Sequence, residues 1–162
     1  MIVVVMGVAG SGKSTVAKTL ARKVKIEYKD ADSFHSAQNV EKMRSGQPLS
    51  DEDRQPWLNS LQKAIQEWIA SGRSVALACS ALKKSYREQL MVDPAQVKFA
   101  YLKGSYPLFY SRLQRRKKHF MSAEMLESQF KALEEPEADE AIICDASESI
   151  PQILKQILKG IS

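Results

Sequence analysis

The sequence predicts an α/β fold in which helices cover both faces of a parallel sheet. Apolar segments of strand length alternate along the chain with longer segments of helical periodicity, a pattern typical of βαβ units. The first segment, residues 2–6, is apolar throughout, as in a central strand that is buried on both faces. A length of 162 residues favours a single domain, residues 1–162.

Each element is predicted from the spacing of its apolar residues. Continuous apolar or β-branched runs predict strands at 2–6, 26–28, 75–79, 97–102 and 141–144. Apolar residues three or four positions apart predict helices at 13–24, 38–44, 56–70, 83–91, 107–116, 125–133 and 150–161. Gly46 and Pro48 end the helix at 38–44, Pro56 marks the expected start of the next helix, and Gly72 ends it.

Composition narrows the class of protein. With 44% hydrophobic and 27% charged residues, the chain is globular rather than disordered or fibrous. The net charge of +5 suits a nucleic-acid binder or a site for small anions and does not choose between them. Cys79 and Cys144 lie in apolar runs without metal-ligand spacing, so we expect two buried thiols in a reducing compartment. No signal-peptide pattern and no long apolar segment is visible, so the expected location is cytoplasmic, with no membrane partner.

A phosphate loop follows the first predicted strand and precedes the first predicted helix. The pattern G-x-x-x-x-G-K-[ST] is matched by Gly7, Val8, Ala9, Gly10, Ser11, Gly12, Lys13, Ser14 and Thr15. Its glycines let the backbone aim successive N–H groups at one point, and the helix adds its positive dipole end. We expect the whole loop to bind a nucleoside triphosphate, with Lys13 at the β- and γ-phosphates and the Ser14 hydroxyl on Mg²⁺.

Two acidic residues at the end of the second predicted strand are candidates for the phosphoryl-acceptor site. Asp30 and Asp32 are two positions apart, so both can face one side, and ligands gather at the carboxyl ends of parallel strands. An acceptor hydroxyl needs a carboxylate that orients it and accepts its proton, a role we assign to Asp32. Both aspartates are also expected to hold Mg²⁺, through water. The alternative is that they are two solvated loop residues.

Residues 32–58 carry a specific resemblance. They read DSFHSAQNVEKMRSGQPLSDEDRQPWL, which resembles the motif D-x-x-H-P-x-x-N-x-x-K-M-x-x-G-x-P-L-x-D-x-D-R-x-P-W-L of the thermoresistant gluconokinase family. Further matching segments are CSALKKSYREQL at 79–90, RLQRRKKHFM at 112–121, SQF at 128–130 and LEEPEADE at 133–140. One departure is Ser36, where the family usually has proline, and this loosens the backbone next to His35.

The resemblance implies a gluconokinase: ATP-dependent phosphorylation of D-gluconate at its 6-hydroxyl, giving 6-phospho-D-gluconate and ADP. It also implies the three-layer P-loop kinase fold of shikimate and nucleoside-monophosphate kinases, with a five-stranded parallel sheet and a mobile lid. Members of the family are commonly dimers, so a homodimer is expected.

The lid is expected within about residues 112–127. A dense basic run, RRKKH, lies there between two predicted helices, where it is otherwise typical of a solvated face. By resemblance to similar kinases, Arg112 and Arg116 approach the transferring phosphoryl group when the lid closes and excludes water. Arg115 is the nearest alternative to Arg116.

A gluconate site needs a cation for the carboxylate and polar groups for the hydroxyls. Arg54 ranks first as the carboxylate ligand because it lies inside the resembling segment. Lys83 and Arg87, one helical turn apart, are further candidates, and His35, Asn39 and Ser80 are expected to address hydroxyls.

Three neighbouring residues are given structural roles. Asp51 and Asp53 are expected to cap the following helix or to pair with the arginine beside them. Trp57 is expected in the core rather than under a sugar.

If the family resemblance is set aside, the residues leave other functions open. A shikimate or nucleoside-monophosphate kinase would share the phosphate loop but lacks the pattern at 32–58. A nucleic-acid-binding or regulatory ATPase would suit the charge, yet the chain has no aromatic-rich basic stripe, so no nucleic-acid partner is expected. The intact Lys13, Ser14 and Asp32 argue against an inactive phosphate-binding module.

Overall fold

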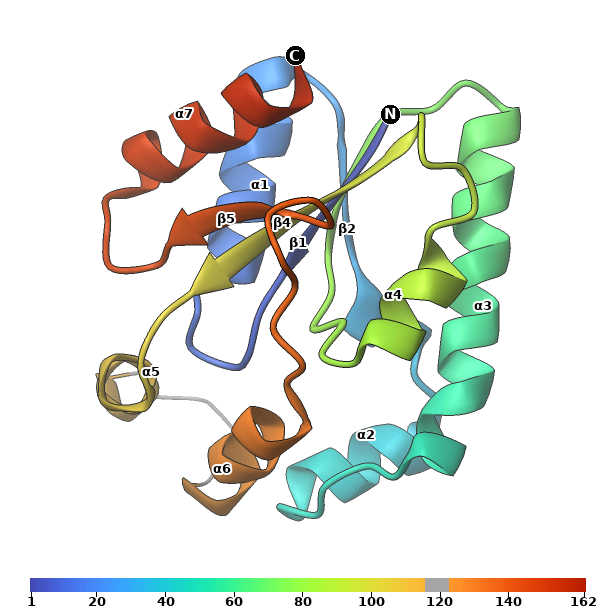
Figure 1. Cartoon of the computed structure of the whole chain (residues 1–162). Helices are drawn as coiled ribbons and strands as arrows, with labels where there is room; N and C mark the ends of the chain where they lie inside the picture. The colour runs from blue at the N-terminus through green and yellow to red at the C-terminus, as the bar shows by residue number, and fades with distance from the viewer. Residues whose placement is uncertain (116–122) are drawn as a thin grey trace.

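Five parallel strands form one sheet, in the order β2-β3-β1-β4-β5 (Figure 1). The computed structural model describes residues 1–115 and 123–162. The strands are β1 (Ile2–Met6), β2 (Glu27–Asp30), β3 (Val75–Ala78), β4 (Val97–Lys103) and β5 (Ile142–Asp145). The central strand β1 is buried throughout and pairs with both β3 and β4, with Ile2 opposite Val75 and Val97. The predicted five-stranded parallel sheet is confirmed.

Helices lie on both faces of the sheet and make the outer two layers (Figure 1). Helices α1 (Lys13–Val24) and α7 (Ile150–Ile161) cover one face, and α3 (Asp51–Ala70) and α4 (Lys84–Leu90) cover the other. The 3-10 turn η1 (Ala31–Phe34) follows β2, and α2 (Ala37–Arg44), α5 (Tyr106–Arg115) and α6 (Ala123–Ala132) lie beyond the carboxyl ends of the strands (Figure 1). Alternate residues of β1 serve the two faces. Val3 and Val5 join the core under α1 and α7, while Ile2, Val4 and Met6 join the core under α3 and α4.

One predicted boundary is wrong. Helix α3 begins at Asp51 rather than at Pro56, which lies inside the helix. A capping box starts it: the Ser50 hydroxyl accepts from the Asp53 N–H (3.1 Å), and the Asp53 carboxylate accepts from the Ser50 N–H (3.0 Å). The cap satisfies amides that a helix start leaves without partners, and so adds a turn before the proline. The other described boundaries lie within two residues of their predicted positions.

Both cysteines are free thiols in the core, as predicted. Burial raises the pKa of Cys79 to about 12 and that of Cys144 to about 11, so both are unreactive at neutral pH. Within residues 1–115 and 123–162, no helix combines the length and apolar character that crossing a membrane requires.

Replacing the cap of α3 tests its contribution. Ser50→Ala removes the acceptor for the Asp53 N–H and should lower the free energy of unfolding by about 1 kcal/mol. Ser60→Ala, at an exposed position within the same helix, is the matched control and should leave stability unchanged or slightly raised, because alanine favours helix. Urea denaturation of both variants measures the difference. Equal stability of the two would show that the capping box contributes nothing.

Candidate active site

The phosphate loop connects the carboxyl end of β1 to the first residue of α1, Lys13. Gly10 (φ 80°) and Gly12 (φ 92°) adopt left-handed backbone conformations that favour glycine. A Cβ on Gly10 would lie 2.7 Å from the carbonyl oxygen of Phe109, so the loop also packs directly against α5. No side chain caps the start of α1, which leaves its first amides for an anion.

A pocket of about 390 Å³ opens next to the loop. It brings together predicted site residues from distant parts of the sequence, among them Lys13, Ser14, Asp32, His35 and Arg54. Lys13 and Ser14 come from α1, Asp32 from η1, His35 from the turn before α2, and Arg54 from the first turns of α3. The remaining wall is made by Ala9, Gly10, Gly12, Val40, Met43, Arg44, Pro48, Leu49, Trp57, Ser80, Leu113, Met125, Ser128 and Gln129.

Asp32 is held in place by the turn that carries it. It lies in η1, not in β2, so the expectation that strand alternation would aim Asp30 and Asp32 the same way is wrong. Instead the Asp30 carboxylate caps the turn by accepting from the Asp32 N–H (2.9 Å). The indole N–H of Trp57 donates to the carbonyl of Ala31 (2.7 Å) and ties the same turn to α3. Trp57 is thus a core residue, as predicted, whose edge also reaches the pocket wall.

The electrostatic surroundings of Asp32 suit a group that accepts a proton. Asp32 is an exposed residue that lines the pocket, and partial desolvation of its carboxyl by the surrounding protein raises the pKa. The nearby Lys13 ammonium opposes this rise, and the Asp30 carboxylate adds to it. Asp30 itself is not part of the pocket wall.

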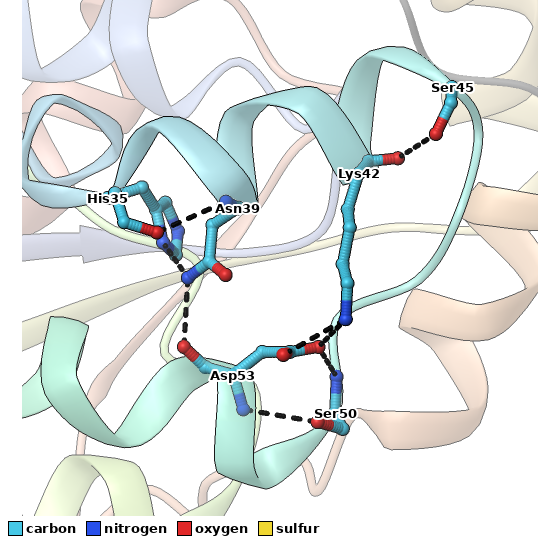
Figure 2. A network of polar contacts seen from close by, with 7 residues as sticks. His35, Asn39, Lys42, Ser45, Ser50 and Asp53 are labelled. Atoms are coloured by element: carbon cyan, nitrogen blue, oxygen red, sulfur yellow. Dashed lines mark hydrogen bonds and ion pairs between the residues drawn. The ribbon is translucent and has the colours of Figure 1, made fainter.

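His35 is fixed by a polar network that joins α2 to α3 (Figure 2). The Asn39 amide nitrogen contacts His35 Nδ1 (3.1 Å) and donates to the carbonyl of Asp53 (2.8 Å). Since the amide group donates to Nδ1, the ring of His35 carries its proton on Nε2. The ring also stacks on Trp57, with centroids 4.4 Å apart. Burial and the nearby Arg54 charge lower the pKa of His35 to about 4, so the ring is neutral at physiological pH.

Two lysines near the pocket form ion pairs that join elements of the fold rather than facing the pocket. Lys42 donates to both carboxylate oxygens of Asp53 (3.0 and 3.1 Å), so Asp53 pairs with this lysine rather than with Arg54 (Figure 2). Lys83, predicted to contact substrate, instead donates to both carboxylate oxygens of Asp51 (2.8 and 3.0 Å) and does not line the pocket.

Arg87 does not contact the pocket, and its predicted role as a substrate ligand is corrected. Only 2% of the residue is exposed. Its guanidinium donates to the Glu140 carboxylate (2.6 Å) and to three backbone carbonyls, those of Ala81, Leu82 and Glu134. With its donors used in this way, the side chain holds α4 to the segment 134–140. The family-like LEEPEADE sequence therefore has a structural role in this protein.

Arg112 lies beside the phosphate loop but outside the pocket that contains Asp32. Its guanidinium donates to the carbonyls of Gly10 (3.4 Å), Ser11 (3.3 Å) and Ala146. It lines a second hollow of about 370 Å³ together with Thr15, Ala146 and the start of α7. Ser11, also part of this lining, is almost fully buried.

Sequence reasoning missed Gln129, which lies in α6. Its side-chain oxygen accepts from the N–H of Ala9 in the phosphate loop (2.7 Å), and the residue lines the pocket. The segment SQF was part of the family resemblance, and that was the available signal, but nothing in the sequence pairs residues 120 positions apart. Arg116 and most of the basic run fall outside the described residues, and so does the middle of the proposed lid.

The fold and the pocket define a small-molecule kinase that uses a phosphate loop. A family model described as shikimate kinase matches residues 9–162. The gluconokinase of Gluconobacter oxydans (strain 621H) is 44% identical over 155 residues, covering 96% of this chain and 87% of the relative. The thermoresistant gluconokinase of Escherichia coli (strain K12) is 40% identical over 162 residues, covering 99% and 93%.

A solved structure agrees with these relatives. The crystal structure of a gluconokinase from Sinorhizobium meliloti 1021 superposes with a TM-score of 0.87 at 35% identity, covering 98% of this chain and 90% of that one. The chain belongs to the gluconokinase family.

The buried position of Arg87 leads to a stability prediction. Arg87→Met leaves Glu140 and three carbonyls without their donor and should lower the free energy of unfolding by about 3 kcal/mol. Arg73→Met is the control, because the Arg73–Glu27 pair has similarly short bonds (2.6 and 2.7 Å) but is exposed to solvent. That variant should change stability little. Equal effects in thermal denaturation would contradict a structural role for Arg87.

Proposed function

We propose that this chain transfers the terminal phosphoryl group of ATP to the 6-hydroxyl of D-gluconate. One observation carries the proposal: Lys13 of the phosphate loop, the acidic Asp32 and the cationic Arg54 line one pocket. The relatives named as gluconokinases support the choice of substrate. A pocket of about 390 Å³ also suits a six-carbon sugar acid beside a terminal phosphate.

Asp32 is the proposed general base. It orients the 6-hydroxyl and accepts its proton as the oxygen attacks the terminal phosphorus. The fixed turn around Asp32 keeps the carboxylate aimed at the acceptor, so that positioning contributes much of the acceleration. Lys13, at the start of α1, stabilises the charge on the phosphate oxygens.

The pocket also fits a magnesium ion. Mg²⁺ prefers oxygen ligands and keeps several of its waters, and Ser14 and Asp32 offer a hydroxyl and a carboxylate on the same wall. When bound, the ion would neutralise charge on the phosphates. Asp30, predicted as a third metal residue, supports the site through the Asp32 N–H instead. Within the described residues, no group of three or more histidine, cysteine or acidic side chains forms a metal cluster.

The opposite side of the pocket is proposed to bind gluconate. Arg54 faces the substrate carboxylate, and the neutral His35 donates from Nε2 to a hydroxyl. The stacking of His35 on Trp57 and its bond to Asn39 hold that donor in one direction.

The nucleotide base is proposed to lie in the second hollow. This hollow adjoins the phosphate loop through Gly10 and Gly12 and has the planar guanidinium of Arg112 in its wall. An arginine plane stacks well on an aromatic base. We therefore assign Arg112 to nucleotide binding rather than to the transferring phosphoryl group.

A lid within residues 112–127 and a homodimer, both suggested by the sequence resemblance, complete the proposal, together with the cytoplasmic location expected from the sequence pattern. Arg116 is proposed to reach the transferring phosphoryl group, with Arg115 as the alternative. Light scattering of the purified protein tests the dimer.

Asp32→Asn should largely abolish turnover of gluconate while ATP still binds, since an amide cannot accept the proton. A coupled ADP-release assay measures turnover, and nucleotide titration measures binding. In the wild type, kcat/KM for gluconate should fall on the acid side as the Asp32 carboxyl of the free enzyme becomes protonated, at a higher pH than an ordinary aspartate requires because its pKa is raised. A variant with near-native turnover would exclude Asp32 as the base.

The same assay tests the choice of substrate. Wild-type protein should release ADP with D-gluconate and not with shikimate or nucleoside monophosphates. Turnover of one of these in preference to gluconate would overturn the proposed function.

Arg116→Ala should lower kcat by about 10³-fold, far more than it weakens nucleotide binding, if this arginine neutralises charge in the transition state. Arg115→Ala is the matched control. A large loss in Arg115→Ala with none in Arg116→Ala would move the role to Arg115.

A further inference from the structure

Behind Arg54, three residues form a chain of polar contacts that leads away from the pocket. The Tyr86 hydroxyl accepts from Arg54 Nη1 (3.3 Å) and donates to the Asp51 carboxylate. Lys83 donates to both oxygens of that carboxylate, at 2.8 and 3.0 Å. Of these four residues, the pocket wall includes Arg54 and excludes Tyr86, Asp51 and Lys83.

The direction of these bonds is set by chemistry. A tyrosine hydroxyl has one proton, and a carboxylate can only accept, so the proton of Tyr86 is used on Asp51. The hydroxyl oxygen therefore presents a lone pair to the guanidinium. The ring of Tyr86 is buried, and both cations, Arg54 and Lys83, lie 5.8 Å from its centroid.

The positive and negative charges in this row of contacts do not cancel, and the surplus positive charge is the one on Arg54, at the pocket. Asp51 provides one negative charge, while Lys83 and Arg54 provide two positive ones. Lys83 donates to both oxygens of the carboxylate, in an ion pair that is partly exposed to solvent. The pKa directions agree with this order of contacts: Lys83 and Tyr86 lower the pKa of Asp51 most, the charge of Arg54 lowers it less, and Asp51 raises the pKa of Lys83. Arg54 is thus left with a positive charge that a substrate anion can use.

We propose that Tyr86, Asp51 and Lys83 are positioning residues that hold Arg54 at the pocket wall with its charge uncancelled, and so select a substrate that carries a carboxylate. This inference rests on the proposed function. Lys83 acts on the substrate only through Asp51 and Arg54, in contrast to the direct contact that the sequence suggested.

A pair of variants separates the indirect role of Lys83 from a direct one. Lys83→Met leaves Asp51 uncompensated, so the carboxylate draws Arg54 and cancels its charge. The KM for gluconate should rise about tenfold, with kcat and the KM for ATP unchanged. The double variant Lys83→Met/Asp51→Asn removes both charges and should recover most of the loss. A double variant as poor as Lys83→Met would show that Lys83 contacts the substrate directly, and an unchanged KM in Lys83→Met would also overturn the proposal.

Tyr86→Phe tests the hydroxyl that links the two cations. The chain offers a matched control, because Tyr101 donates in the same way to the Glu135 carboxylate (3.0 Å), which pairs with Lys103 (3.6 Å), away from the pocket. Tyr86→Phe should raise the KM for gluconate by about tenfold. It should leave unchanged the inhibition constant of D-gluconamide, which lacks the charge. Tyr101→Phe should leave both constants unchanged.

The ratio of these two constants is the decisive measurement, because a merely structural defect would weaken gluconate and gluconamide alike. An equal ratio in wild type, Tyr86→Phe and Tyr101→Phe would overturn the inference while leaving the proposed function standing. A wild type that does not phosphorylate gluconate would overturn the proposed function itself.

Discussion

The parallel direction of all five strands is the constraint on which the site depends. It brings the carboxyl ends of the strands to one edge of the sheet, and the residues that follow β1 and β2 meet there. The phosphate loop follows β1, and the turn with Asp32 follows β2. These strands are not neighbours, because β3 lies between them, and this gap leaves room for a pocket between loop and turn. An antiparallel arrangement would have sent the two segments to opposite ends.

The scaffold engages several charged side chains and so defines which ones face the pocket. Lys42 is bound to Asp53, Lys83 to Asp51 and Arg87 to Glu140. Each pair ties one element to another, and none of these six residues lines the pocket. Arg87 is the buried member among these three pairs, and there desolvation offsets much of the attraction; the Lys42 and Lys83 pairs are partly exposed. Here the pairs hold the first turns of α3 and α4 where Arg54 needs them.

Three residues from the last third of the chain contact the phosphate loop. Phe109 packs its backbone against Gly10, Arg112 donates to carbonyls of the loop, and Gln129 accepts from an amide of the loop. The loop is therefore held between its own strand and helix and the helices α5 and α6. These contacts couple the position of both helices to the loop, and this gives a physical reason for the family-like residues far from the loop in sequence.

The sequence alone determined the parallel α/β fold, the phosphate loop and the acidic residue after β2, because each follows from local periodicity or from a short motif with its own chemistry. The resembling segment at 32–58 indicated the family, and the relatives agree. Only the tertiary structure decided what each cation contacts. Arg54, Lys83 and Arg87 are chemically similar in the sequence, yet one lines the pocket, one is paired with Asp51 and one is buried against Glu140. The reason is that the partner of a long charged side chain comes from a distant element, and its position is set by packing rather than by sequence spacing.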